Sequence, residues 1–76
     1  MRINIKVLGG LKKYVNFGGL QELDIDESMT GIELVRMLGF PDGLSYVYLL
    51  NGKRESLDNG LKEGDEVAIF PVVTGG

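Results

Sequence analysis

Only one segment of this 76-residue chain has the pattern of an amphipathic helix, and that segment is short. It begins at Thr30, where the run Thr-Gly-Ile-Glu predicts a capping box that satisfies the first free amides of the helix. Gly39 and Pro41 predict its end, because glycine favours the left-handed cap and proline prevents the helix from resuming. A helix of about nine residues is unstable alone in water. It must therefore pack on strands, through the apolar stripe of Ile32, Leu34, Val35 and Leu38.

Other segments have the alternation, or the β-branched and aromatic content, that is typical of strands. They span residues 2–7, 20–26, 46–50, 53–55 and 66–70. The first alternates strictly and places Ile3, Ile5 and Val7 on its buried face. A helical turn is expected over 11–15, and Asn51-Gly52 predicts a hairpin. We expect the first and last strands to lie side by side and parallel in the centre, because both are apolar and the hairpins occupy the outside.

The element order is therefore β-β-α-β-β-β. It predicts an α+β fold in which a mixed sheet of about five strands carries one main helix on one face. In the second strand, Leu23 and Ile25 are expected to face the core, and Glu22 and Asp24 to face solvent. We assign residues 1–71 to one folded domain and residues 72–76 to a flexible tail.

Composition excludes several classes of function. The chain has no cysteine and no histidine, so it lacks a thiol nucleophile, a disulfide and an imidazole base or metal ligand. The net charge of −3 disfavours binding to nucleic acid or to an anionic membrane. No apolar run reaches the ~20 residues of a membrane span. The first residues are not those of a signal peptide, so we expect a cytoplasmic protein. A self-contained enzyme is not expected at this size; the function should lie at a surface or a terminus.

The end of the chain, Thr74-Gly75-Gly76, has the most chemical potential. Residues 67–76 have no charged side chain, so the terminal carboxylate is the expected charge of this segment, and it is ionised at neutral pH. Glycines fit a narrow tunnel and adopt backbone conformations closed to other residues. We therefore expect Gly76, together with Gly75, to present the carboxylate to another enzyme. The alternative is a frayed, inert tail.

The last strand predicts a partner surface on the face of the sheet opposite the helix. If Val67 and Ile69 face the helix, Ala68 and Phe70 face outward. Apolar and aromatic groups exposed on a small domain indicate a protein contact. The alternative is an inverted parity that places Phe70 in the core.

Neighbouring segments extend this expected surface. In the third strand we expect Tyr46, Tyr48 and Leu50 outward and Val47 and Leu49 inward, and we expect Lys6 and Arg2 as rim charges that steer docking. No metal site is expected, because the acids Asp24, Asp26 and Glu27 lack the spacing of a calcium loop. The predicted partner-binding residues are Lys6, Tyr48, Ala68, Phe70, Pro71, Val72, Val73 and Thr74.

Residues 61–76, Leu-Lys-Glu-Gly-Asp-Glu-Val-Ala-Ile-Phe-Pro-Val-Val-Thr-Gly-Gly, resemble the end of the ubiquitin-like sulfur carriers of the MoaD/ThiS family. Within that family, the small subunits of molybdopterin synthase are the most similar, in the Gly-Asp-Glu-Val turn, the Phe-Pro exit and the Gly-Gly end. Val72 stands where those subunits commonly have a second proline, a departure that weakens the molybdenum pathway more than the carrier class. The resemblance implies a ubiquitin-like β-grasp fold.

The resemblance also implies a chemistry for Gly76. An E1-like adenylyltransferase, which binds the ATP and Mg²⁺, would join the Gly76 carboxylate to AMP. A persulfide on a donor protein would then displace AMP and leave a C-terminal thiocarboxylate. The large subunit of molybdopterin synthase would receive the sulfur for its pterin precursor. This chain would bind no cofactor and would serve as a co-substrate, or as the non-catalytic small subunit of a sulfurtransferase.

Three alternatives stay open. The chain could be a protein modifier whose Gly76 is joined to lysines, as in ubiquitin-like archaeal modifiers. It could carry sulfur for thiamine or for tRNA thiolation. In a different class, it could be a β-grasp binding module with an inert tail. The modifier and the carriers would be activated in the same way. They would differ in the group that attacks the activated Gly76 carbonyl in the final step.

Overall fold

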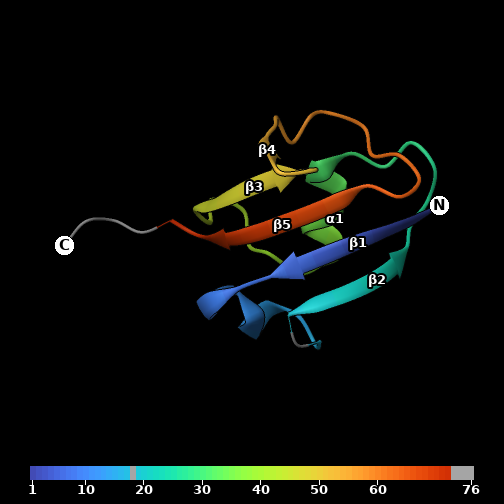
Figure 1. Cartoon of the computed structure of the whole chain (residues 1–76). Helices are drawn as coiled ribbons and strands as arrows, with labels where there is room; N and C mark the ends of the chain where they lie inside the picture. The colour runs from blue at the N-terminus through green and yellow to red at the C-terminus, as the bar shows by residue number, and fades with distance from the viewer. Residues whose placement is uncertain (18, 73–76) are drawn as a thin grey trace.

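The computed structural model describes residues 1–17 and 19–72. Its elements are β1 (Arg2–Val7), the 3-10 helix η1 (Gly9–Tyr14), β2 (Leu20–Asp24), α1 (Gly31–Met37), β3 (Tyr46–Leu50), β4 (Lys53–Arg54) and β5 (Glu66–Pro71). In these residues, five strands form one mixed sheet of order β2-β1-β5-β3-β4, and α1 lies across one face (Figure 1). The predicted order β-β-α-β-β-β and the central, parallel pairing of the first and last strands are confirmed.

The core lies between the sheet and α1. The central pair of strands supplies most of it, because Ile5 pairs with Val67 and Val7 with Ile69, and these side chains are buried. Leu34 and Val35 of α1 are buried against them. Removing such side chains from water contributes about 1.5–3 kcal/mol each, which is how so short a helix is held. The buried cluster is Ile3, Ile5, Val7, Leu11, Ile25, Leu34, Val35, Phe40, Tyr48, Leu61, Val67 and Ile69.

The ends of α1 match the sequence prediction. The Thr30 hydroxyl accepts a hydrogen bond from the Glu33 backbone N–H at 3.3 Å, and the Glu33 carboxylate accepts one from the Thr30 N–H at 3.1 Å. Together they form the predicted capping box. After the helix, Gly39 has a φ of +92°, as expected of a left-handed cap.

Some bounds differ from the prediction. The helical turn η1 begins at Gly9 rather than at 11, and the second strand ends at Asp24 although the Ile25 side chain is buried. β4 is only two residues long. β5 continues through Pro71, because the pairing of Pro71 with Tyr46 at this end of the strand extends the ladder by one residue.

The orientation predicted for the β3 side chains is wrong: Tyr46, Tyr48 and Leu50 face the helix side, and Val47 and Leu49 face outward. Tyr48 pairs with Ile69 on the helix side of the sheet and is only 6% exposed. Tyr46 lies on the same side, where its ring meets Phe40 at 5.6 Å between centroids, and Leu50 pairs with the buried Val67. The segment Tyr-Val-Tyr-Leu-Leu is apolar at every position, so it contains no alternation that could reveal its parity.

The Tyr48 side chain reaches the first turn of α1. Its hydroxyl is buried without a hydrogen-bond partner among the described residues, and burial is the largest cause that raises the Tyr48 pKa to about 12. A Cβ added at Gly31 would lie 2.8 Å from the Tyr48 hydroxyl oxygen and 3.1 Å from the Leu57 carbonyl oxygen. The helix can therefore lie this close to the sheet because residue 31 has no side chain.

We expect Gly31→Ala to destabilise the fold by about 1–3 kcal/mol, because the added methyl group overpacks this contact. Tyr48→Phe should restore part of the loss, since it removes the nearest atom. Urea unfolding of the two single variants and the double variant measures both effects. Helix propensity alone predicts the opposite sign, a gain of up to about 1 kcal/mol for alanine. A stabilised Gly31→Ala would therefore contradict the close contact.

Candidate functional site

The reactive end predicted from the sequence lies outside the described residues. Gly75 and Gly76, together with the predicted partner residues Val73 and Thr74, belong to it. The structure does describe the platform from which this end departs. That platform consists of the last residues of β5 and of the sheet face opposite α1.

β5 presents different side chains on its two faces. Val67 and Ile69 are buried on the helix side, and Ala68 and Phe70 are half-buried on the opposite side. This is the arrangement predicted for β5, so the alternative with Phe70 in the core is excluded. The placement is a direct consequence of the strand's period of two.

A row of paired residues crosses the whole sheet through Ala68. Paired residues on neighbouring strands point to the same side of a sheet, so the row lies on the face opposite α1. Phe70 pairs with Val47 in the next row of that face. The row across the five strands is Leu20, Lys6, Ala68, Leu49 and Arg54. We define the open face as Lys6, Leu20, Val47, Leu49, Ala68 and Phe70.

The open face is mostly apolar, with Lys6 near its centre and Arg54 at the end of the same row. Leu20 is 67% exposed, Lys6 is exposed, and the other members are half-buried. A shallow hollow of about 490 Å³ lies over it, bordered by Lys6, Leu20 and Ala68. Asn4 and Glu66 also border the hollow. A surface with an apolar middle and a few charged groups around it suits a protein partner better than a small molecule.

Arg2 lies at the far end of the same sheet side and is already paired. Its guanidinium contacts Glu22 at 3.2 Å and Asp24 at 3.1 Å. The hydrogen bond from Arg2, followed by its positive charge, lowers the pKa of the Asp24 carboxyl. Both groups are exposed, so the pair contributes little to stability. Of the two cations predicted at the rim, Lys6 makes no such pair with the described residues, whereas the charge of Arg2 is compensated.

Of the predicted partner residues in the described part of the chain, Lys6, Ala68 and Phe70 are on the open face, Pro71 and Val72 follow it at the end of β5, and Tyr48 is elsewhere. Tyr48 is in the core, because the antiparallel register with β5 places Val47 and Leu49 outward instead. Sequence reasoning also missed Leu20. Its signal was present, because Leu20 shares the parity of Glu22 and Asp24, which were expected to face solvent.

The base of the tail is held by η1. A Cβ at Gly9 would lie 2.8 Å from Pro71 Cγ, so glycine allows this segment to lie against the end of β5. Val72 follows and is 45% exposed. A cleft of about 360 Å³ beside it is lined by Lys13, Tyr14 and Leu44, among others. The chain therefore leaves the sheet in a direction set by Pro71.

The described residues contain no group of three His, Cys, Asp or Glu side chains that could hold a metal ion. Within the same part of the chain, no helix is long and apolar enough to cross a membrane.

The chain matches one protein family over nearly its whole length and is similar to several solved structures. The profile of the ThiS family matches residues 5–76. A search of the curated proteins found no significant match. Among solved structures, SAMP1 from Haloferax volcanii has a TM-score of 0.78 and 23% identity, over 100% of both chains.

Two further structures are named for molybdopterin converting factor. A Pyrococcus furiosus protein assigned as its subunit 1 has a TM-score of 0.77 and 21% identity, over 95% of this chain and 98% of that one. The complex of subunits 1 and 2 from Helicobacter pylori contains a chain with a TM-score of 0.65 and 23% identity, over 100% of both. These likenesses confirm the ubiquitin-like β-grasp fold.

The two faces of β5 should differ in their effect on stability. Ile69→Ala should cost about 2–5 kcal/mol, because it empties a buried site. Phe70→Ala should cost about 1 kcal/mol, because its ring is partly in water in the isolated protein. Urea unfolding of both variants tests this difference. Equal losses in the free energy of unfolding would show that Phe70 contributes to the stability of the fold as much as a buried core residue does.

Proposed function

This chain belongs to the ThiS family, and we propose that it is a sulfur carrier whose reactive group is the C-terminal carboxylate of Gly76. The observation that carries the proposal is the family match, which extends through residue 76 and so includes Gly75 and Gly76. The fold supports it, because this fold is shared with structures named as a modifier and as subunits of molybdopterin converting factor. We place the protein in the cytoplasm, as a co-substrate of other enzymes.

Activation of the carboxylate is the first proposed step. A carboxylate is a poor electrophile because it has no good leaving group. An E1-like adenylyltransferase with bound ATP and Mg²⁺ would let the Gly76 oxygen attack the α-phosphorus, which expels pyrophosphate and leaves an acyl adenylate. The protein contributes the carboxylate and a rigid body that delivers it. In this proposal the chain itself binds no cofactor.

Sulfur transfer is the second proposed step. The terminal sulfur of a donor persulfide attacks the acyl carbon and AMP leaves, which gives an acyl disulfide. A thiol then attacks the donor's sulfur of that disulfide, and the thiocarboxylate is released on Gly76. The thiol and the persulfide must come from partners, because this sequence has no cysteine.

The open face and the tail base supply the docking surface in this proposal. An enzyme that holds Ala68, Phe70 and Pro71 receives the tail in a defined direction, since Pro71 lies against Gly9. Lys6 in the middle of the face favours a partner with an acidic group opposite it. In the sequence, Val72, Val73 and Thr74 lie between this platform and the reactive glycines.

We propose the large subunit of a molybdopterin synthase as the acceptor enzyme. Its support is the likeness to the Helicobacter pylori complex, in which a similar chain is bound to subunit 2. A second candidate is protein modification, favoured by the likeness to SAMP1, the small archaeal modifier protein 1 of Haloferax volcanii. A carrier for thiamine or tRNA thiolation shares the same activation. These functions share the activated Gly76 carbonyl and differ in which nucleophile attacks it.

Incubation with an E1-like enzyme, ATP, Mg²⁺ and a persulfide donor should raise the intact mass by the difference between one sulfur and one oxygen. Deletion of Gly76 should abolish both the mass gain and the adenylate, and leave the unfolding midpoint unchanged. Attachment to lysines of other proteins would identify a modifier instead. A truncated chain that still forms the adenylate would contradict the mechanism, as would an unchanged wild-type mass with an enzyme that thiolates another carrier.

The affinity for the activating enzyme should depend on the open face. Phe70→Ala should weaken binding by about 2 kcal/mol, roughly 30-fold, if the ring is a central anchor. Met37→Ala is the matched control, because Met37 is an exposed apolar residue on α1, away from this face. Calorimetric titration of both variants measures the difference. Equal affinities would exclude Phe70 as an anchor.

A further inference from the structure

In the described part of the chain, the strand β2 forms one edge of the sheet, and three of its five residues direct their backbone groups away from β1. The Gly19 carbonyl accepts from Val7 N–H of β1 at 2.9 Å, and Ile25 N–H donates to Met1 O at 2.8 Å. Inward and outward positions alternate along an antiparallel edge strand. Gly19 and Ile25 direct these groups toward β1. The backbone N–H and C=O groups of Leu20, Glu22 and Asp24 are therefore directed away from the sheet.

One of the outward carbonyls already accepts a hydrogen bond from an amide. The Gln21 side chain donates from Nε2 to the Glu22 carbonyl oxygen at 3.2 Å, in an exposed position. This amide occupies the position that the N–H of an added strand would take. An exposed hydrogen bond of this kind contributes about 1 kcal/mol or less, so a peptide backbone can replace it at little cost.

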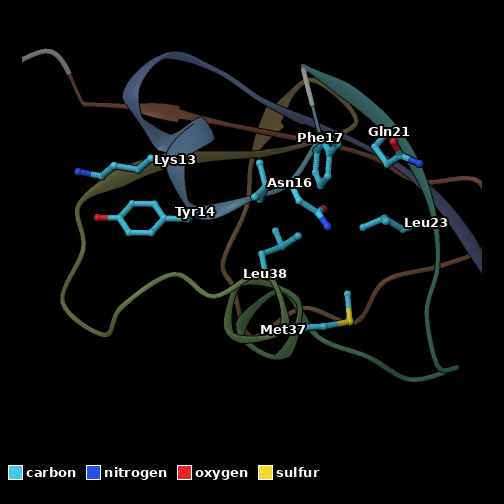
Figure 2. A pocket seen from close by; sticks show the side chains of 9 residues that line it. Lys13, Tyr14, Asn16, Phe17, Gln21, Leu23, Met37 and Leu38 are labelled. Carbon is cyan, nitrogen blue, oxygen red and sulfur yellow. The ribbon is translucent and has the colours of Figure 1, made fainter.

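A groove of about 710 Å³ runs beside this edge on the helix side (Figure 2). Leu23 of β2, Phe17 of the preceding segment and Leu38 of α1 point toward it, and Met37 lies at its border (Figure 2). Met37 is 50% exposed, although it is a large apolar side chain. The groove therefore offers an apolar floor directly beside the unpaired strand.

The charge of the groove is one-sided. Among the described residues that line it, Lys13 is the charged one, at the end near Tyr14 (Figure 2). The acids of β2 do not oppose it, because Glu22 and Asp24 extend to the other face of the sheet and contact Arg2. A ligand with an acidic group near Lys13 and apolar side chains along the groove is complementary to this arrangement.

We propose that the β2 edge and this groove form a binding site for an extended, acidic and apolar segment of a partner protein. The segment adds to β2 as a further strand and bonds to the outward groups of Leu20, Glu22 and Asp24. Every second side chain of it then enters the groove against Leu23 and Met37, because side chains alternate along a strand. The groove lies on the helix side of the sheet, whereas the Leu20 side chain points to the open face, and the site does not involve Gly76.

The probe is a short acetylated peptide in which alternating isoleucine and threonine residues follow a pair of glutamates. Titrated into the full ¹⁵N-labelled chain, it should shift the backbone amides of Leu20, Glu22 and Asp24 and slow their hydrogen exchange. The same peptide with prolines at every second position should not bind, because it lacks the N–H groups of a strand. A version with lysines in place of the glutamates should bind several-fold more weakly, because of Lys13.

Two variants separate the edge from the groove. Glu22→Pro removes an outward N–H and leaves the bonds to β1 intact, so it should abolish binding while the fold persists. Met37→Glu should weaken binding at least about tenfold, since it places a charge at the groove. Ser56→Glu is the matched control: it adds the same charge to an exposed residue that follows β4, at the opposite edge of the sheet, and affinity should stay within about twofold.

Three results would overturn the proposal. One is no binding of the peptide at millimolar concentration, and another is binding whose shifts lie at Lys6, Ala68 and Phe70 of the open face instead of at Glu22 and Asp24. The third is a dimer in the absence of peptide with the same three amides protected, which would assign the edge to a second copy of this chain. Because deletion of Gly76 should leave peptide affinity unchanged, failure of this site and failure of the carrier function are measured separately.

Discussion

The parallel pairing of β1 with β5 is the interaction on which the rest of the structure depends. It joins two segments about sixty residues apart in the chain and brings Ile5, Val7, Val67 and Ile69 onto one surface. Such a pairing between distant segments has a large loop-closure cost, so it is stable only when α1 covers this surface and excludes water. In turn α1, with seven residues, depends on that surface for its own stability. Sheet and helix therefore form together.

The same pairing determines where function can lie. Once Val67 and Ile69 face the helix, Ala68 and Phe70 must face the other way, and the strand must deliver the end of the chain beyond Pro71. The open face and the tail base are thus two consequences of one strand. The edge groove has a different origin. Among the described residues, β2 has a neighbouring strand on one side only, and Met37 of α1 is left half-exposed beside it. A small domain of this kind acts through surfaces and an end of the chain rather than through an internal cavity.

Much of the site could be predicted, and the failures have a common cause. Alternation was informative in β1, where polar residues mark the outer face, and in β5, where Glu66 marks it. The outward orientation predicted for Ala68, Phe70 and Lys6 agrees with the structure, and their role in binding stays a prediction. It was uninformative in β3, where every residue is apolar, so Tyr48 was assigned to the wrong side. Leu20 had a readable signal in its parity with Glu22. The groove beside β2 had none, because its walls come from three elements that only the packed structure brings together.

The sequence by itself determined the element order, the capped helix, the residues of the central strands that face the core and the family, because these depend on local periodicity and on short motifs. The tertiary structure decided the register of β3 against β5, the close contact of Gly31 with Tyr48 and the position of the free edge. Those features depend on which strands become neighbours. Strand neighbours are set by burial of the whole apolar surface at once, and no single segment contains that information.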